Sequence, residues 1–177
     1  MSSLKRAEAR AQRYQDDSMS LKTRLSHWWL ALMILPRLVL HPEQRRLLAA
    51  MRCFSQQLPQ MMQQPIPEAM QQITPDGPTV TADPHSIRQL ADLAALLDRR
   101  SPLGICLRRS LVRYHFLRQA GVPVNVVFGA RFDNGRQANS HIAGHAWTTL
   151  HNTPYYEAGE NWRNFIVMFT WPEASEQ

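Results

Sequence analysis

The sequence predicts an α+β fold, and two patterns support this prediction. Up to about residue 120, apolar residues recur at helical spacing, whereas from Val124 onward they alternate as in β-strands and are separated by turn signals. Helices followed by an antiparallel group of strands are typical of the α+β class. The chain has 177 residues, of which 44% are hydrophobic, which is enough to form a core.

The N-terminal part is predicted to be helical over residues 21–58, after a polar stretch over residues 1–20. Residues 55–78 contain seven Gln and five Pro, and prolines at that density oppose a long helix. We therefore expect a Gln/Pro/Met-rich linker there. The predicted organisation is a helical N-terminal region over 1–80 and a second domain over 81–177.

Two further helices have clear start and stop signals. Asp83 is a suitable N-cap and Pro84 a suitable first residue for one of them. The next is predicted over residues 106–119, since Gly121 and Pro123 follow it as stop signals.

The C-terminal part reads as an antiparallel meander of strands. Alternating apolar residues over 124–128 predict the first strand, and the Asp-Asn-Gly run at 133–135 predicts a hairpin turn after it. The next strand is predicted over 141–150, followed by a turn at 151–154. Residues 164–171 are predicted to form a last, well-buried strand.

The charge and the apolar runs limit the partners and the location. The formal charge is +6, and residues 1–80 hold most of the excess, which indicates an anionic partner such as nucleic acid, an acidic peptide or a membrane surface. The longest apolar run, Trp28–Leu40, is shorter than the ~20 residues of a spanning helix and contains Pro36 and Arg37. We read it as a kinked core or partner-facing helix, with peripheral membrane contact as the minority alternative. The charged N-terminus lacks the apolar core of a signal peptide, so a cytoplasmic location is predicted.

Cys106 lies at the start of a predicted helix that is rich in arginine. Unpaired N–H groups at a helix start, together with nearby cations, favour the thiolate, which is the nucleophilic form of cysteine. The alternative is a simple buried thiol, which is the preferred interpretation of the other cysteine, Cys53.

The run Gly-His-Ala-Trp strengthens the catalytic interpretation of Cys106. His145, Trp147 and Thr149 fall on one face of a predicted strand, and Glu157 follows twelve residues after the histidine. A hairpin would bring that carboxylate beside the imidazole, where it would orient the ring. A core histidine and a solvated acid are the alternatives.

Zinc is a competing interpretation of the same residue types, with Cys53, Cys106, His141 and His145 as candidates. His141 and His145 would be ~13 Å apart along a strand, so they could not share one ion there. The chain also lacks a Cys-x-x-Cys pair. We predict no metal site and no cofactor.

The combined pattern "CLRRSLVRYHFLRQAGVPVNVVFGARF…HIAGHAW" resembles the leader peptidases of lasso-peptide biosynthesis, the lasso B proteins, within the transglutaminase-like cysteine-enzyme superfamily. The resemblance covers about Leu97 to Glu157. In that family a Cys-Leu-x-Arg-Ser/Ala-Leu run opens the helix and Ala-His-Ala-Trp lies on the strand. Gly144 stands here in place of the usual alanine, and Glu157 in place of the usual aspartate.

The resemblance implies a transglutaminase/papain-like core, with the catalytic cysteine at a helix N-terminus packed on an antiparallel sheet. It makes Cys106 the nucleophile, His145 the general base and Glu157 the orienting acid, with Glu160 as the competing acid. The implied reaction is cleavage of the leader from a ribosomally made precursor peptide. The implied partners are that precursor, a separate leader-recognition protein and the macrolactam cyclase of the same pathway.

Three alternatives remain open at this stage. One is a transglutaminase-like acyl transferase of another peptide-modification pathway, and another is a pseudo-enzyme with a binding role. The third is a non-catalytic protein that binds nucleic acid or a membrane, although no groove-reading motif supports it and no nucleic-acid partner is predicted. That protein would use the arginines near the proposed helix: Arg99, Arg100, Arg108, Arg109, Arg113 and Arg118.

Overall fold

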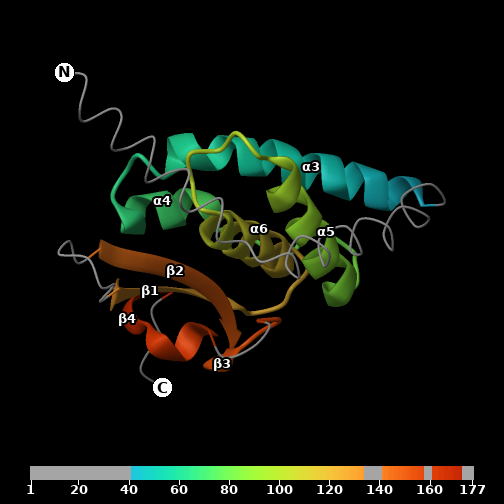
Figure 1. Ribbon diagram of the computed structural model, residues 1–177. Helices are drawn as coiled ribbons and strands as arrows, with labels where there is room; N and C mark the ends of the chain where they lie inside the picture. Colours follow the sequence, from blue (N-terminus) through green and yellow to red (C-terminus); the bar gives the residue numbers. More distant parts are fainter. Residues whose placement is uncertain (1–40, 134–140, 158–160, 173–177) are drawn as a thin grey trace, which may run out of the picture. The chain divides into compact units, whose positions relative to one another are not determined.

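The computed structural model describes residues 41–133, 141–157 and 161–172 (Figure 1). Within these residues, four α-helices pack together on a four-stranded antiparallel sheet, which confirms the α+β prediction. The helices are α3 (Pro42–Met61), α4 (Ile66–Ile73), α5 (Pro84–Leu97) and α6 (Ile105–Gln119). The strands are β1 (Asn125–Asp133), β2 (His141–Leu150), β3 (Thr153–Pro154) and β4 (Ile166–Trp171), with a short 3₁₀ helix, η1 (Asn161–Asn164), before β4.

The start of α5 follows its sequence signal. α3 begins at Pro42, and the Asp83 carboxylate accepts a hydrogen bond from the Ser86 backbone N–H at 2.9 Å at the start of α5. This is the N-cap interaction that the sequence predicted. α6 differs, because its N-cap residue is Gly104 and no side chain caps its first turn.

The segment expected to be a linker contains helix instead. α3 continues through Pro59 to Met61, and α4 follows five residues later with Ala69, Met70 and Ile73 fully buried. Pro65 and Pro67 lie at the N-cap and in the first turn of α4, where a missing N–H costs little, whereas Pro59 lies inside the last turn of α3. Burial of the apolar face of α4 stabilises this helix, and a count of prolines in the sequence does not reveal that burial. The proposed boundary at residues 80/81 stays a prediction.

α6 is the central helix, lying between α3 and the sheet (Figure 1). On the α3 side, the rings of Phe54 and His115 stack with centroids 4.1 Å apart. The Thr74 hydroxyl, just after α4, lies 2.8 Å from the Tyr114 hydroxyl and accepts a 2.8 Å hydrogen bond from the Trp171 indole. These contacts join α4, α6 and β4 through buried polar groups that are all satisfied.

The strand order is β3-β2-β1-β4, so the chain does not form the simple meander that we expected. After the β2–β3 turn, where His151 and Asn152 have positive φ, the chain passes through η1 and then pairs β4 with β1. On its other side β2 pairs with the two residues of β3, and the Ser110 hydroxyl of α6 donates to the Ala146 carbonyl of β2 at 2.7 Å.

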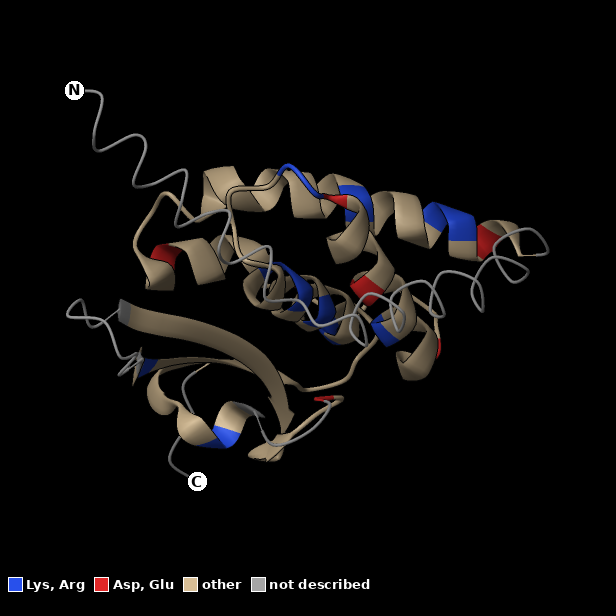
Figure 2. Cartoon of the chain, in the orientation of Figure 1, with Lys and Arg blue, Asp and Glu red and all other residues tan. Residues whose placement is uncertain are grey.

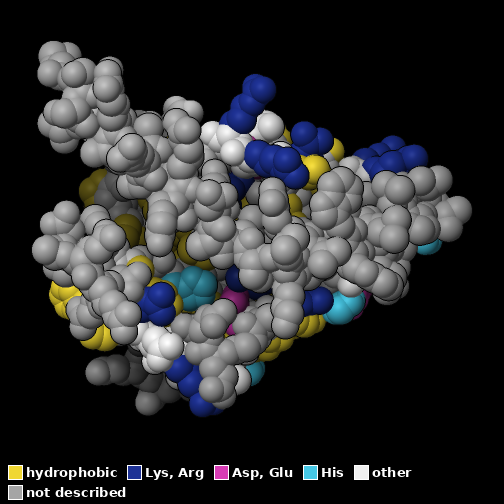
Figure 3. Space-filling view, viewed as in Figure 1, with side chains coloured by type: hydrophobic (Ala, Val, Ile, Leu, Met, Phe, Trp, Pro, Cys, Tyr) yellow, Lys and Arg dark blue, Asp and Glu magenta, His cyan; other side chains and the backbone are white. Residues whose placement is uncertain are grey.

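β4 is more exposed than predicted. Ile166, Val167 and Met168 are exposed, and only the second half of the strand is partly covered. β4 is an edge strand with no helix over its first half, so the prediction of a well-buried strand was wrong. Together with Phe132 and Ile142, which are paired across β1 and β2, these side chains make the end of the sheet apolar (Figure 3).

Several predictions fall at least partly outside the described residues: the polar stretch over 1–20, the predicted helix before residue 41 with its apolar run over 28–40, and the Asp133–Gly135 turn after its first residue. Within the part of the chain that the structure describes, no helix is long and apolar enough to cross a membrane.

We expect Gly129→Ala to destabilise the protein, because a Cβ at Gly129 would lie 2.8 Å from the Trp147 ring and 2.9 Å from the Phe165 Cβ. Such overpacking of a core costs about 1–3 kcal/mol. Gly144→Ala is the matched control, since no atom lies within 4 Å of its Cβ position. Chemical denaturation of both variants measures the difference, and equal free energies of unfolding would contradict this account of the packing.

Candidate active site

Cys106 lies in the first turn of α6, where the sequence placed it. Its Sγ is 3.9 Å from the position that a Cβ on Gly104 would occupy, so the thiol is at the N-terminal end of the helix. The side chain is partly exposed and forms no disulfide. The first backbone N–H groups of a helix have no partner within it, and here no side chain caps them. The site therefore offers a reachable thiol beside N–H groups that can stabilise negative charge.

Arg108 holds the loop before Cys106 in place. Its guanidinium donates to the backbone carbonyls of Leu103 at 3.0 Å, of Ala95 at 2.7 Å and of Asp98. Burial lowers the pKa of Arg108, while the negative charges of Asp98 and ionised Cys106 raise it. Arg108 is therefore close enough to the thiol for their charges to interact, and its position is fixed by three carbonyls.

His145 lies on β2, next to the point where α6 contacts that strand. Ala146, its neighbour, accepts the hydrogen bond from Ser110, which is one helical turn after Cys106. Arg109, three residues after Cys106, is near enough to His145 to act on its pKa. The thiol and the imidazole therefore belong to the same junction of α6 with β2.

Aromatic rings surround the His145 imidazole. Trp147 stacks on it with centroids 5.7 Å apart and an interplanar angle of 22°, as expected for residues on one strand face. Phe165, just before β4, approaches to 5.0 Å. Gly129 lies opposite His145 on β1, and its missing side chain leaves room for Trp147 and Phe165. These two rings cover part of the imidazole, and the side chain stays partly exposed.

The pKa of His145 is lowered, first by burial and then by the positive charges of Arg109 and Arg131. Each of these causes disfavours the imidazolium. Because the usual histidine pKa is about 6.5, the ring is neutral near pH 7 and can accept a proton. Within the described residues its nitrogens make no hydrogen bond, which leaves them for a thiol or a substrate.

Glu157 is buried between two arginines of α6. Its carboxylate lies 3.3 Å from Arg109 and 3.1 Å from Arg113, and Arg113 also binds Asp92 of α5 at 2.7 Å. Burial raises the pKa of Glu157, with Asp92 adding to the rise, while Arg109 and Arg113 oppose it. In Figure 2 the basic residues of α6 lie between acidic residues of α5 and of the segment after β3.

Cys106 and the two arginine partners of Glu157 lie on α6, and one of those arginines, Arg109, also acts on the pKa of His145. Basic, acidic and histidine side chains lie close together in Figure 3. Among the described residues, the hydrogen bonds of the Glu157 carboxylate go to the two arginines and none joins it to His145. The orienting role of Glu157 therefore stays a prediction, and Glu160 lies outside the described residues.

Cys53, which we expected to be a buried thiol, is exposed on α3, so that prediction was wrong: the apolar face of α3 buries Met51 and Phe54 and leaves Cys53 outside. In residues 41–133, 141–157 and 161–172 no group of three or more His, Cys, Asp or Glu side chains is placed to hold a metal ion. Arg108 and Arg113, offered above as part of a basic face, are buried and bonded to protein groups.

Sequence reasoning missed three residues of the site. Arg131 lies over the Phe165 ring at 4.8 Å, and its charge acts on His145. The alternation of side chains along a strand could have indicated Arg131. It lies two residues after Gly129, which pairs with His145, so all three residues share one face of the sheet. No sequence signal marked Phe165 as a cover for the ring or Ser110 as the contact to β2.

A family model described as the Transglutaminase-like superfamily matches residues 31–170, which is more than half of the chain. The chain belongs to the Transglutaminase-like superfamily. Such domains are associated with cysteine-dependent peptidase or acyltransferase activity, which agrees with a thiol at the start of α6. No curated protein and no solved structure matches this transglutaminase-like chain.

We expect Arg131→Gln to raise the pKa of His145 in this transglutaminase-like site, since it removes a positive charge that disfavours the imidazolium. Arg163→Gln, an exposed arginine of η1 over Trp162, is the control and should leave that pKa unchanged. NMR titration of the ring in both variants provides the measurement. An unchanged or lower value in Arg131→Gln would show that the Arg131 charge does not reach His145.

Proposed function

We propose that this protein is a leader peptidase that cleaves the leader from a ribosomally synthesised lasso-type precursor peptide, with Cys106 as nucleophile and His145 as general base. The observation that carries the proposal is the junction of α6 with β2, where the thiol turn and the imidazole strand are joined by the Ser110–Ala146 hydrogen bond. The lasso B resemblance from Leu97 to Glu157 supports the choice of substrate.

The proposed reaction begins with transfer of the thiol proton to neutral His145. The sulfur attacks the carbonyl carbon of the last leader residue, and the carbonyl oxygen becomes an oxyanion. The C–N bond then breaks as the imidazolium gives its proton to the leaving amine, which becomes the N-terminus of the core peptide. Water, deprotonated by His145, attacks the thioester and releases the leader carboxylate and the Cys106 thiol.

The Cys106 backbone N–H is the proposed oxyanion donor. It belongs to the first turn of α6, which no side chain caps, so the group is free to bind a developing charge. Such donors commonly contribute 10²–10³-fold to the rate of acyl transfer.

The proposed partners are the precursor peptide, a separate leader-recognition protein and the macrolactam cyclase that uses the new amine, all in the cytoplasm. Residues 1–80 have no strand pattern in sequence, whereas the recognition domains of this pathway are small folds with strands. We therefore assign leader recognition to a separate protein.

An acyl transferase is the second candidate, favoured by the activities associated with the superfamily. It would form the same thioester but pass the acyl group to an amine. Cleavage in H₂¹⁸O separates the two, since hydrolysis places one ¹⁸O atom in the leader carboxylate and transfer places none there.

We expect Cys106→Ala to reduce precursor cleavage by more than about 10³-fold, because loss of a nucleophile leaves only binding and oxyanion stabilisation. Cys53→Ala is the matched control and should keep the wild-type rate, since Cys53 is an exposed residue of α3. Mass spectrometry of the purified precursor after incubation measures both rates. Cleavage by Cys106→Ala at the wild-type rate would overturn the cysteine mechanism.

We expect Glu157→Gln to lower turnover by less than the ~10⁴-fold seen when other triads lose their acid, while precursor binding is retained. Glu157→Asp should preserve activity, since the resembled family uses aspartate there. Steady-state kinetics of folded variants, checked by thermal unfolding, gives kcat and KM separately.

The Glu160→Gln variant tests the competing acid in the same assay. If it lowers turnover and Glu157→Gln does not, Glu160 is the orienting acid. If neither matters, Cys106 and His145 act as a dyad and Glu157 serves the arginine network alone.

A further inference from the structure

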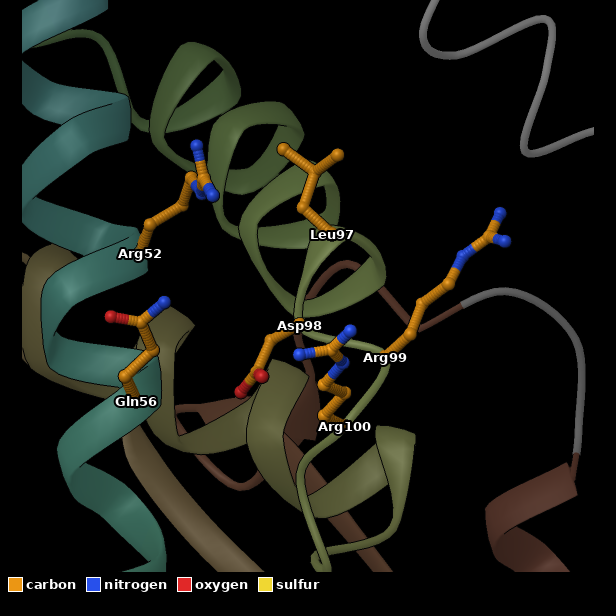
Figure 4. Close-up of a pocket in the computed structure, with 6 residues that line it drawn as sticks. All are labelled: Arg52, Gln56, Leu97, Asp98, Arg99 and Arg100. Carbon is orange, nitrogen blue, oxygen red and sulfur yellow. The ribbon is translucent and has the colours of Figure 1, made fainter.

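The described residues form a cleft between α3 and the loop that joins α5 to α6, and His145 is not among the residues that line it. This cleft has a volume of about 280 Å³ and is shown in Figure 4. Arg52 and Gln56 extend into it from α3, Arg100 approaches it from the loop, and Arg99 extends away from it (Figure 4). The lining is Arg52, Gln56, Leu97, Asp98, Arg99 and Arg100.

The cleft is positively charged. Its one acid, Asp98, accepts a hydrogen bond from the Ser55 hydroxyl at 3.2 Å and lies 3.8 Å from the Arg108 guanidinium, so its charge is already balanced from within. Arg52, Arg99 and Arg100 are exposed, and none of them forms an ion pair with another described residue. The cleft therefore offers unbalanced guanidinium groups to an anion from outside.

The wall of the cleft is fixed relative to the thiol. Arg108 of α6 binds the carbonyls of Ala95, Asp98 and Leu103, which lie on both sides of Arg99 and Arg100 in the chain. A binding surface held this way loses little conformational entropy when a ligand arrives.

The cleft also lies within a short peptide's reach of Cys106. Arg100 precedes Cys106 by six residues, and an extended chain spans at most ~3.3–3.6 Å per residue, so their Cα atoms are at most ~20 Å apart. A substrate peptide attached at the thiol could cross that distance with about six extended residues.

We propose that this cleft binds an acidic segment of the peptide substrate, through the carboxylates of Asp or Glu side chains. Guanidinium groups bind carboxylates through paired N–H donors, and Gln56 adds an amide that can donate to the same oxygens. The identity of the ligand as substrate rests on the proposed peptidase function, whereas the binding itself needs no catalysis.

The test measures binding of a fluorescein-labelled (Gly-Glu)₄ peptide to the full-length Cys106→Ala protein by fluorescence anisotropy. We expect Arg52→Glu combined with Arg100→Glu to weaken binding about tenfold or more, because attraction becomes repulsion at two positions. Arg46→Glu combined with Arg163→Glu makes the same charge change at exposed sites outside the cleft and should cost less than about twofold. A (Gly-Gln)₄ peptide should bind more weakly than the acidic one.

Three results would overturn the proposal: equal losses in the two charge-reversal pairs, equal binding of the Gln peptide, or preferential binding of a single-stranded oligonucleotide at the cleft. Circular dichroism checks the fold, and Arg52→Gln combined with Arg100→Gln replaces the reversal pair if that pair does not fold. Cleavage without cleft binding would overturn this inference alone, whereas cleft binding without cleavage of a precursor would overturn the peptidase function alone.

Discussion

The arrangement of the site depends on one buried guanidinium, that of Arg113. It binds Asp92 of α5, the Glu157 carboxylate and the Tyr156 carbonyl, so that one side chain joins two helices to the segment after β3. Arg113 is 2% exposed, and a buried charge with fewer partners would be costly. These partners hold α6 against α5 and against the segment after β3, while the Ser110–Ala146 hydrogen bond joins α6 to β2, the strand that carries His145.

The same network sets the electrostatics around His145. Glu157 balances part of the charge of Arg109, which would otherwise act in full on the imidazole. The Arg109 Nε and the Arg131 Nε are buried without hydrogen-bond partners, so neither arginine is fully satisfied by the described residues. Glu157 thus affects His145 through Arg109, whether or not it also contacts the ring in the reacting complex.

The sequence was sufficient wherever a local pattern decides the structure. Asp83 and Pro84 predicted the start of α5, and the alternating residues of His141–Leu150 predicted the whole of β2. The sequence was insufficient where a contact between residues far apart in the chain decides the structure. β4 pairs with β1, which is distant in sequence, and α4 forms because its apolar face is buried, which no local count of prolines registers.

The same contrast between local patterns and distant contacts applies to the candidate site. Cys106 and His145 could be proposed from sequence because each lies in a short motif on a recognisable helix or strand. The partners of Glu157 could not, since Arg109 and Arg113 read as parts of a basic surface until the fold buries them against the acid. The net charge of a chain does not show which arginines are already paired within the protein. Arg108 and Arg113 bind other groups of the protein, whereas no ion pair joins the arginines of the cleft to another described residue.

The lowered pKa of His145 has a consequence for the proposed reaction. A ring that resists protonation is a weaker base toward the thiol but a stronger acid once it carries the proton. In peptide cleavage the difficult event is departure of the amine, which cannot leave without a proton, and an imidazolium placed beside Arg109 and Arg131 gives its proton up readily. In the proposed reaction the arginines around His145 therefore favour departure of the amine, the step that would separate leader from core.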